Sequence, residues 1–372
     1  MNEQNLHRAW EHLKSNHIPA ALLSDPATIT WLTGYASPIQ TGASPFEGGP
    51  ALVWLQDGQI TIILSDAEAG ALESSGASIR DYLSYTIDEP LAGAQNQAAA
   101  LQEVIKQGEA SPGKVAVEFN HLSATMLKAL HEIFPNAQLL AMDGTFNLLR
   151  AVKTETEIEK IKAALNLCDL AQKVARTSMK PGLSEIELWC AIKTILETAA
   201  ASRVPVLADL VGGLRTADIG GLPGSYALQP GDALIADVVP RLDGYWGDSA
   251  GTYFLEEPQA ELKKSYQIVR EVLQKGVDAA RPGMRACDLD ALMRSEIQRQ
   301  GYDPYPHHSG HGIGTTFHEE PRIVPYNKLP LEAGMIIALE PGIYLSGVGG
   351  IRLEDVVLIL PHGNEILTTH LN

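Results

Sequence analysis

The chain has 372 residues, of which 45% are hydrophobic and 20% are charged, as in a soluble globular protein with room for two domains. Its 28 basic and 45 acidic residues give a formal net charge of −17, which argues against nucleic-acid and anionic-membrane partners. Solubility is the simplest interpretation of this acidity, and carboxylates gathered around cations are a second one.

Cysteine usage and apolar runs bear on the compartment. The three cysteines, Cys168, Cys190 and Cys287, are scattered and odd in number, which argues against a disulfide framework and a zinc knuckle. The first twenty residues contain no apolar segment typical of a signal peptide, and no apolar run approaches the length of a membrane span. We therefore expect a cytoplasmic protein.

Residues 1–146 predict an α/β domain. Helices are expected at 5–16 and 122–134, and strands at 20–24, 51–55, 60–64 and 114–119. The pair Asp57-Gly58 predicts a hairpin turn between two of these strands. This part shows no cluster of His, Asp or Glu with the spacing of metal ligands, so we expect the chemistry in a second domain at 150–372.

The second domain begins with two predicted helices. A long helix is expected at 154–180, with Thr154 and Glu157 at capping-box spacing. Pro181-Gly182 should end it. Ser184 and Glu187 have the same capping spacing at the start of a helix that runs to about residue 200.

An internal repeat follows these helices. The segment LQPGDALIAD (228–237) aligns with LEAGMIIALE (331–340), and KPGLSEIELW (180–189) has a weaker match in RPGMRACDLD (281–290). Similar strands can recur by chance in an α/β protein. Matched carboxylates at the ends of the two copies favour a true repeat instead.

The repeat places two carboxylates in each copy, Asp237 and Asp248 in the first and Glu340 and Glu354 in the second. A two-fold arrangement would bring all four together. Four carboxylates cannot share a partly buried site unless cations neutralise them or several are protonated. Two metal ions joined by bridging carboxylates would activate water for hydrolysis. One histidine with four carboxylates suits Mn²⁺, with Co²⁺ or Zn²⁺ as alternatives.

Arg352 lies two residues before Glu354 in a predicted strand, so both are expected on one face. One interpretation is an ion pair between them. The other, favoured by the repeat, is that Glu354 bridges metals while Arg352 orients a carboxylate or substrate.

The stretch HHSGHGIGTTFHEE (307–320) holds four of the eleven histidines. His307 and His311 have the spacing of the zinc motif H-E-x-x-H, but its glutamate is missing and glycines crowd the segment. The glycines instead suggest a close approach of the backbone. Adjacent strand residues point in opposite directions, so His308 is expected at the surface or behind the site. Glu319 and Glu320 are expected to be solvated or structural.

The segments GHGIGTTFHEEP, LEAGMIIALEPGIY and GGIRLEDVVLI closely resemble the pita-bread metallopeptidases. This family includes methionine aminopeptidase, aminopeptidase P, prolidase and the non-metal relative creatinase. The resemblance covers residues 150–372, and DPATITWLTGY (25–35) resembles more weakly the creatinase/prolidase N-terminal domain. Methionine aminopeptidases generally lack that domain, so its presence, with His307 four residues before His311, implies the proline-specific branch.

The resemblance implies an α/β (α+β) protein: a creatinase-like N-terminal domain and a pseudo-two-fold pita-bread catalytic domain. It implies that Asp237 and Asp248 hold one metal ion, that His311 and Glu340 hold the other, and that Asp248 and Glu354 bridge them. The implied activity is cleavage of short Xaa-Pro peptides by a water that bridges the metals. A homodimer is also implied, because relatives with this N-terminal domain commonly complete each other's pocket.

Roles of the remaining site residues follow from the same resemblance. His318 would bind substrate and stabilise the intermediate, and Glu340 would also move the proton of the attacking water. His307 would line the substrate pocket, although a structural histidine is an equally good interpretation.

Two departures from the family pattern concern the substrate. The family usually carries a histidine in a segment H-G-x-P, which contacts the region of the scissile amide, and Gly220 stands at that position here. The usual D-x-T-R-T segment reads DSAGT, with Ala250 and Gly251. These changes leave open a small non-peptide amide or C–N substrate, as in creatinase. A non-catalytic binding module is a third hypothesis, although such modules commonly lose ligands.

Overall fold

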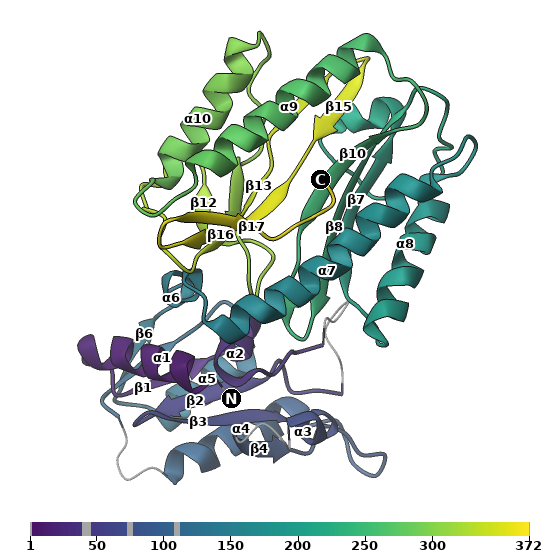
Figure 1. Ribbon diagram of the computed structural model, residues 1–372. Helices are drawn as coiled ribbons and strands as arrows, with labels where there is room; N and C mark the ends of the chain where they lie inside the picture. Colours follow the sequence, from purple (N-terminus) through teal and green to yellow (C-terminus); the bar gives the residue numbers. More distant parts are fainter. Residues whose placement is uncertain (1, 39–45, 73–76, 108–111, 372) are drawn as a thin grey trace. The chain divides into compact units, whose positions relative to one another are not determined.

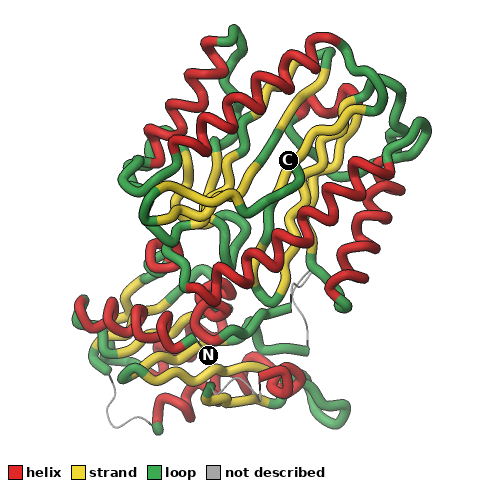
Figure 2. The backbone as a smooth tube through the Cα atoms, in the orientation of Figure 1, coloured by secondary structure: helices red, strands yellow, loops and turns green. Residues whose placement is uncertain are grey.

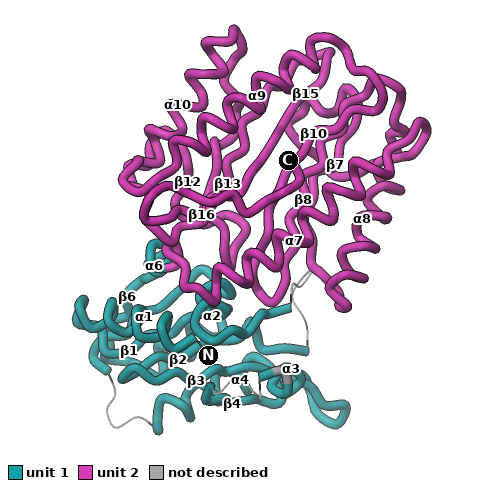
Figure 3. Tube along the Cα trace, viewed as in Figure 1, with its two compact units in different colours: residues 1–149 teal, residues 150–372 magenta. Residues whose placement is uncertain are grey.

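The computed structural model describes residues 2–38, 46–72, 77–107 and 112–371. The chain divides into two compact units, residues 1–149 and residues 150–372 (Figure 3).

The first unit is built on a six-stranded mixed sheet with the order β4-β3-β2-β1-β5-β6 (Figure 1). Its strands are β1 (Ala20–Leu23), β2 (Leu52–Gln56), β3 (Gln59–Ser65), β4 (Ser78–Tyr82), β5 (Lys114–Val117) and β6 (Gln138–Ala141). Its helices are α1 (Glu3–Ser15), α2 (Pro26–Thr33), α3 (Asp66–Ala69), the short 3₁₀ helix η1 (Gly70–Leu72), α4 (Gly93–Lys106) and α5 (Ala124–Ile133). The helix α6 (Asn147–Ala151) spans the boundary between the units in sequence.

Residues of β1 alternate between two hydrophobic cores. Ala21 and Leu23 belong to the core that includes residues of α1 and α2, whereas Ala20 and Leu22 belong to the core that includes residues of α4 and α5. Successive strand residues point to opposite faces, so a strand covered on both sides must be apolar throughout. The predicted hairpin at Asp57-Gly58 is confirmed, with both residues at positive φ, 51° and 72°.

The second unit contains two sheets and a two-stranded ribbon (Figures 1 and 2). The first sheet has the order β10-β8-β7, with β9 paired to β8. It consists of β7 (Val206–Gly212), β8 (Ala233–Leu242), β9 (Tyr245–Trp246) and β10 (Ser249–Phe254). Helices α7 (Glu155–Ser178) and α8 (Glu185–Ala200) pack on it. Both predicted capping boxes are formed, at Thr154–Glu157 and at Ser184–Glu187.

The second sheet has the order β12-β11-β13-β16-β17. It consists of β11 (Gly310–Gly312), β12 (Glu319–Ile323), β13 (Ile336–Leu339), β16 (Asp355–Leu360) and β17 (Gly363–Ile366). Helices α9 (Ala260–Ala279) and α10 (Ala286–Arg299) share a hydrophobic core with it. The ribbon pairs β14 (Gly342–Leu345) with β15 (Gly349–Arg352), and the 3₁₀ helix η2 (Gly213–Asp218) follows β7.

The internal repeat has a structural counterpart in matched backbone hydrogen bonds. The N–H of Gly182 donates to the carbonyl of Leu228 at 2.8 Å, and that of Gly283 donates to Leu331 at 2.9 Å. Both glycines have positive φ, 82° and 87°, as a left-handed turn after a helix requires. Each half therefore fixes its second helix to the start of its carboxylate-bearing strand in the same way.

Among the described residues, no helix combines the length and the apolar character that a membrane crossing needs.

Candidate metal centre

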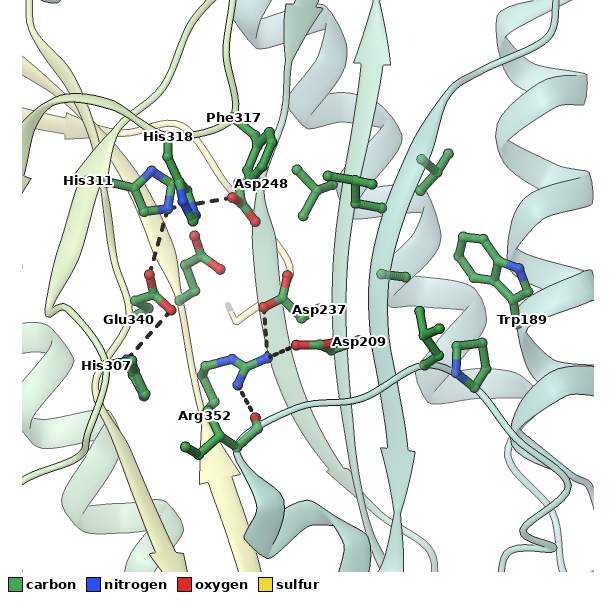
Figure 4. A pocket seen from close by; sticks show the side chains of 18 of the residues that line it. Trp189, Asp209, Asp237, Asp248, His307, His311, Phe317, His318, Glu340 and Arg352 are labelled. Carbon is green, nitrogen blue, oxygen red and sulfur yellow. Dashed lines mark hydrogen bonds and ion pairs between the residues drawn. The ribbon is translucent and has the colours of Figure 1, made fainter. Parts of the chain in front are cut away.

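A cavity of about 720 Å³ in the second unit is lined by residues from both halves of the repeat (Figure 4). All eight residues that the sequence singled out line it: Asp237, Asp248, His307, His311, His318, Glu340, Arg352 and Glu354. Its other wall is mainly apolar and includes Ile186, Trp189, Leu222 and Pro223. The cavity therefore joins a charged end to an apolar end.

His311 lies in β11 between two glycines that allow tight packing of its strand. A Cβ at Gly310 would come within 2.0 Å of the Ala338 carbonyl oxygen, and one at Gly312 within 2.2 Å of the Glu320 carbonyl oxygen. The glycines therefore allow the backbone of β11 to lie close to the neighbouring strands β12 and β13.

The ring of His311 is oriented by a backbone carbonyl. Its Nδ1 lies 3.0 Å from the Gly312 oxygen, which can only accept, so Nδ1 carries the proton. The lone pair of Nε2 is then free, 3.6 Å from Asp248 Oδ2 and 3.6 Å from Glu340 Oε1. Burial lowers the pKa of His311 to about 4, which keeps the ring neutral at pH 7. A neutral imidazole with an outward lone pair is the form that binds a metal ion.

The four acids occupy matched places in the two halves. Asp237 lies within β8 and Glu340 directly follows β13, as predicted. Asp248 lies in the break between β9 and β10, and Glu354 in the break between β15 and β16. The prediction that Glu354 lies inside a strand is therefore wrong. Interrupted pairing at these two points allows each carboxylate to turn into the cavity.

These acids are too crowded to be ionised together without a cation. Burial, followed by the charges of nearby carboxylates, raises the pKa of Asp248 and of Glu354 well above the usual range. Burial also raises the pKa of Asp237, to about 6, against the opposing effect of Arg352. Within the described residues, Asp237 Oδ1 and Glu354 Oε1 are buried without a hydrogen-bond partner.

The donor set fits a site for divalent cations. Asp248, His311 and Glu354 each offer a ligand atom, and these three atoms all lie within 4.8 Å of one another. A divalent cation there would satisfy the unpaired oxygens and would return the pKa values of the acids toward ionisation.

Arg352 is 3% exposed and is paired with aspartates. Its Nη2 lies 2.8 Å from Asp237 Oδ2 and 3.4 Å from Asp209 Oδ2, and its Nη1 donates to the Ile219 carbonyl (Figure 4). The sequence offered an ion pair between Arg352 and Glu354 as one interpretation, but Arg352 forms its ion pair with Asp237 instead. Arg352 therefore orients a carboxylate of the protein, and it also lines the cavity.

His307 ends a hydrogen-bonded chain that starts at Arg352. Arg352 Nη1 donates to the Tyr344 hydroxyl at 3.3 Å, and this hydroxyl lies 2.8 Å from His307 Nε2. His307 Nδ1 lies 2.8 Å from the His308 carbonyl oxygen, so Nδ1 carries the proton and Nε2 accepts from Tyr344. The ring is fixed by these contacts and still lines the cavity.

His308 is not at the surface, so the first of its two expected places is wrong; its contact with Glu340 agrees with the second, a place behind the site, although its ring also lines the cavity. Residues 307 and 308 are not in a strand, so the alternation rule does not apply, and both rings line the cavity. His308 Nδ1 accepts from Arg322 at 3.1 Å, which leaves the proton on Nε2, 2.8 Å from Glu340 Oε1. Burial opposes ionisation of Glu340, but this hydrogen bond from His308 is the largest opposing effect, and the pKa of Glu340 is lowered to about 2.

His318 lies beside His311, with 4.1 Å between the ring centroids (Figure 4). Burial and the neighbouring imidazoles of His311 and His308 lower its pKa to about 3, so the ring is neutral at pH 7. The adjacent Glu319 is structural, as one of its two interpretations had it, and is not solvated. Its carboxylate lies 2.7 Å from Lys153 Nζ and 3.3 Å from Arg150 Nε, all nearly fully buried.

The two departures from the family pattern have different surroundings. A Cβ at Gly220 would come within 2.0 Å of Asp209 Oδ2, so the space of a side chain at 220 is already filled. A Cβ at Gly251 would meet the Tyr253 hydroxyl at 2.6 Å, and Tyr253 bonds to Gln172 of α7. Neither Ala250 nor Gly251 lines the cavity, although Ala250 lies directly opposite Asp237 in the pairing of β10 with β8.

Two protein families match the sequence of this chain. Residues 159–361 match metallopeptidase family M24, and residues 6–152 match the creatinase/prolidase N-terminal domain. The chain belongs to metallopeptidase family M24. It is therefore a hydrolase with the pita-bread fold, and the family implies divalent metal ions.

Relatives of this M24 chain match it over nearly its whole length. A putative dipeptidase, YkvY, of Bacillus subtilis is 27% identical over 366 residues, which cover 98% of this chain and 97% of the relative. A Staphylococcus aureus protein described as an uncharacterized peptidase is 29% identical over 361 residues, covering 96% and 97%.

Solved structures give the same result. An Xaa-Pro dipeptidase from Bacillus anthracis superposes with a TM-score of 0.83 at 26% identity, covering 98% of this chain and 97% of that one. A prolidase from Pyrococcus horikoshii superposes with a TM-score of 0.83 at 25% identity, covering 98% of each chain.

Proposed function

We propose that this chain is a metal-dependent dipeptidase that hydrolyses Xaa-Pro dipeptides. The observation that carries the proposal is a buried group of four carboxylates around a neutral His311, in a cavity whose other end is apolar. The similarity to an Xaa-Pro dipeptidase and to a prolidase over the whole chain supports the substrate class. These comparisons do not favour the non-peptide alternative.

We assign the metal ligands as the sequence suggested. Asp237 and Asp248 would hold one ion, His311 and Glu340 the other, and Asp248 and Glu354 would bridge them. Two divalent ions held there would lower the pKa of a shared water and polarise the scissile carbonyl. Mn²⁺ suits this oxygen-rich set best, with Co²⁺ or Zn²⁺ as alternatives.

The chain's own residues would then move protons and position the substrate. Glu340 is ionised at pH 7 and can accept a proton from the attacking water, while His308 holds its carboxylate through Nε2–H. The neutral ring of His318 can donate a hydrogen bond to the oxygen of the scissile amide as negative charge develops on it. His307, held by Tyr344, would form one wall of the substrate site.

We further propose a cytoplasmic homodimer with short peptides as substrates and no nucleic-acid or membrane partner. Free Cys168, Cys190 and Cys287 and the net charge of −17 support this setting. Residues 1–146 would form the creatinase/prolidase-like N-terminal domain, and residues 150–372 the catalytic domain.

The test is a hydrolysis screen of Ala-Pro, Ala-Ala, Pro-Ala and creatine, with chelator-treated protein and added Mn²⁺, Co²⁺ or Zn²⁺. We expect Ala-Pro to be cleaved only after metal is added, and Asp248→Asn to abolish cleavage. Asp243→Asn is the matched control, because Asp243 is exposed in the turn between β8 and β9. Cleavage of creatine without Ala-Pro would support the non-peptide alternative, and metal binding without any hydrolysis would support a binding module.

A further inference from the structure

Asp209 lines the cavity and is not one of the assigned metal ligands. It lies in β7, directly opposite Asp237 of β8 in the antiparallel register. Opposite residues of such a pair point to the same face and have Cα atoms about 4.5–5.5 Å apart. The Asp209 side chain is 40% exposed, so it is accessible from the cavity.

The carboxylate is held in place on one side and open on the other. The backbone N–H of Gly221 donates to Oδ1 at 2.9 Å. Oδ2 lies 3.4 Å from Arg352 Nη2, and the same nitrogen lies 2.8 Å from Asp237. Because the shorter contact goes to Asp237, Asp209 keeps charge that is available to a ligand. Figure 4 shows both aspartates directed at the same nitrogen of the guanidinium.

The glycine at 220 makes room for this carboxylate. The Cβ of any other residue there would come within 2.0 Å of Oδ2 and 2.5 Å of Cγ of Asp209. Gly220 does not have positive φ, so its backbone would accept alanine, and the conflict is with the Asp209 side chain alone. Asp209 and Gly220 therefore act as a pair that places a negative charge in this part of the cavity.

We propose that Asp209 binds an ammonium group on the substrate residue that precedes the scissile bond. This inference rests on the proposed peptidase function. In a peptide with a free N-terminus, the α-ammonium is separated from the scissile carbonyl by a single Cα. The scissile carbonyl would lie at the assigned ligands, so the α-ammonium must lie close beside them, and Asp209 stands directly opposite the assigned ligand Asp237.

The apolar wall beyond Asp209 fits a second source of the same group. Ile186, Trp189 and Leu222 line the cavity and can cover the methylene stem of a lysine side chain. A charged side-chain ammonium reaching Asp209 along this wall would be bound by the same chemistry as the α-ammonium. Two substrate pairs separate the sources.

The experiment compares kcat/KM of wild type and Asp209→Asn for four substrates. Ala-Pro and N-acetyl-Ala-Pro differ in the α-ammonium, and Lys-Pro and norleucine-Pro differ in the side-chain ammonium. Asp209→Asn retains an acceptor for the Gly221 N–H, so the local structure should persist. Asp218→Asn is the control, because it removes one charge from an exposed position in the same segment.

We expect Asp209→Asn to lower kcat/KM about tenfold for the substrate whose ammonium it binds, through KM, and to leave the partner lacking that group unchanged. An equal loss for Ala-Pro, Lys-Pro and norleucine-Pro, with N-acetyl-Ala-Pro unchanged, assigns the α-ammonium. A loss confined to Lys-Pro relative to norleucine-Pro assigns the side chain. Equal effects of Asp209→Asn and Asp218→Asn on all four substrates would overturn the inference.

Calorimetry with L-alanine amide separates this inference from the proposed function. The ligand carries an ammonium and needs no hydrolysis, so weaker binding to metal-loaded Asp209→Asn than to wild type supports the inference even if no peptide is cleaved. Equal binding to both proteins, with peptides cleaved, would refute the inference and leave the proposed function standing. Absence of cleavage for every peptide in wild type would refute the function alone.

The pairing with Gly220 gives a double-mutant cycle. Gly220→Ala should displace the Asp209 carboxylate and reproduce the loss seen in Asp209→Asn. In an Asp209→Ala background the clash is gone, so adding Gly220→Ala should change kcat/KM little further. Additive losses would contradict the pairing.

Discussion

Replacing Glu319 by glutamine should destabilise the second unit strongly. This carboxylate is 1% exposed and is the partner of two cations, Lys153 and Arg150, whose side chains are also nearly fully buried. Burial alone would raise the pKa of Glu319, but the charges of Lys153 and then Arg150 outweigh it and lower that pKa. The acid is therefore ionised at neutral pH, and glutamine would remove the counter-charge that Glu319 supplies to the buried Lys153 and Arg150.

Removing one partner of a buried ion pair costs about 3–5 kcal/mol. For a domain of this size each kcal/mol shifts Tm by roughly 2–4 °C, so Glu319→Gln should lower Tm by roughly 6–20 °C. Thermal unfolding followed by circular dichroism measures this. Thr315 and Thr316 also donate to Glu319, so the loop that carries His318 should loosen. We therefore expect a lower kcat even at temperatures far below Tm, where the protein is still folded.

The adjacent Glu320 provides the matched control. It is half-buried and accepts from the Arg322 N–H and from Asn327, so Glu320→Gln should lose about 1 kcal/mol or less. Adding Lys153→Met to Glu319→Gln should recover part of the stability, because one uncompensated charge is removed. The reasoning fails if Glu319→Gln melts within a few degrees of Glu320→Gln.

Three further predictions concern pH and packing. The raised pKa values of Asp248 and Glu354 stabilise the folded state below their unfolded pKa values near 4, and this contribution is lost as pH rises through the folded values. Burial lowers the pKa values of His307, His311 and His318, so these rings titrate below 6.5. Tm of chelator-treated protein should therefore fall above pH 6.5, less so in Glu354→Gln, and a flat profile would contradict this. His308→Ala should raise the pKa of Glu340 and move the acidic limit of kcat/KM to higher pH, whereas an unmoved limit would argue against His308 as its donor. Gly312→Ala should lower Tm, because its Cβ would meet a carbonyl oxygen at 2.2 Å; unchanged melting would show that the strands can separate cheaply.

Periodicity and capping predicted most elements of the fold. The capping box at Thr154 fixed the start of α7 to one residue, and the repeat predicted matched placement of the acids. Local patterns could not reveal the break at Glu354, because GGIRLEDVVLIL reads as one continuous apolar strand. The break depends on β15 pairing with β14 while β16 pairs with β13, which is a property of the assembled sheets.

Site residues could be predicted where they lie in the internal repeat or in the histidine-rich segment 307–320. Site residues outside these motifs could not be predicted. The surface position expected for His308 is wrong because strand alternation was assumed for a segment that is not a strand. Asp209 was missed because a single aspartate in an ordinary strand carries no spacing signal. Its relation to Gly220 exists only in three dimensions, where β7 and the loop at 220 meet. The sequence did nevertheless indicate this part of the cavity, because Gly220 stands where the family usually has a histidine.

The most direct test of the central claim is the rate of Ala-Pro hydrolysis by chelator-treated protein as Mn²⁺ is titrated in. We expect no hydrolysis without metal and a rate that rises until about two ions are bound per chain, as a two-metal site requires. Hydrolysis that persists in the presence of chelator, or the absence of hydrolysis at every metal concentration, would contradict the account.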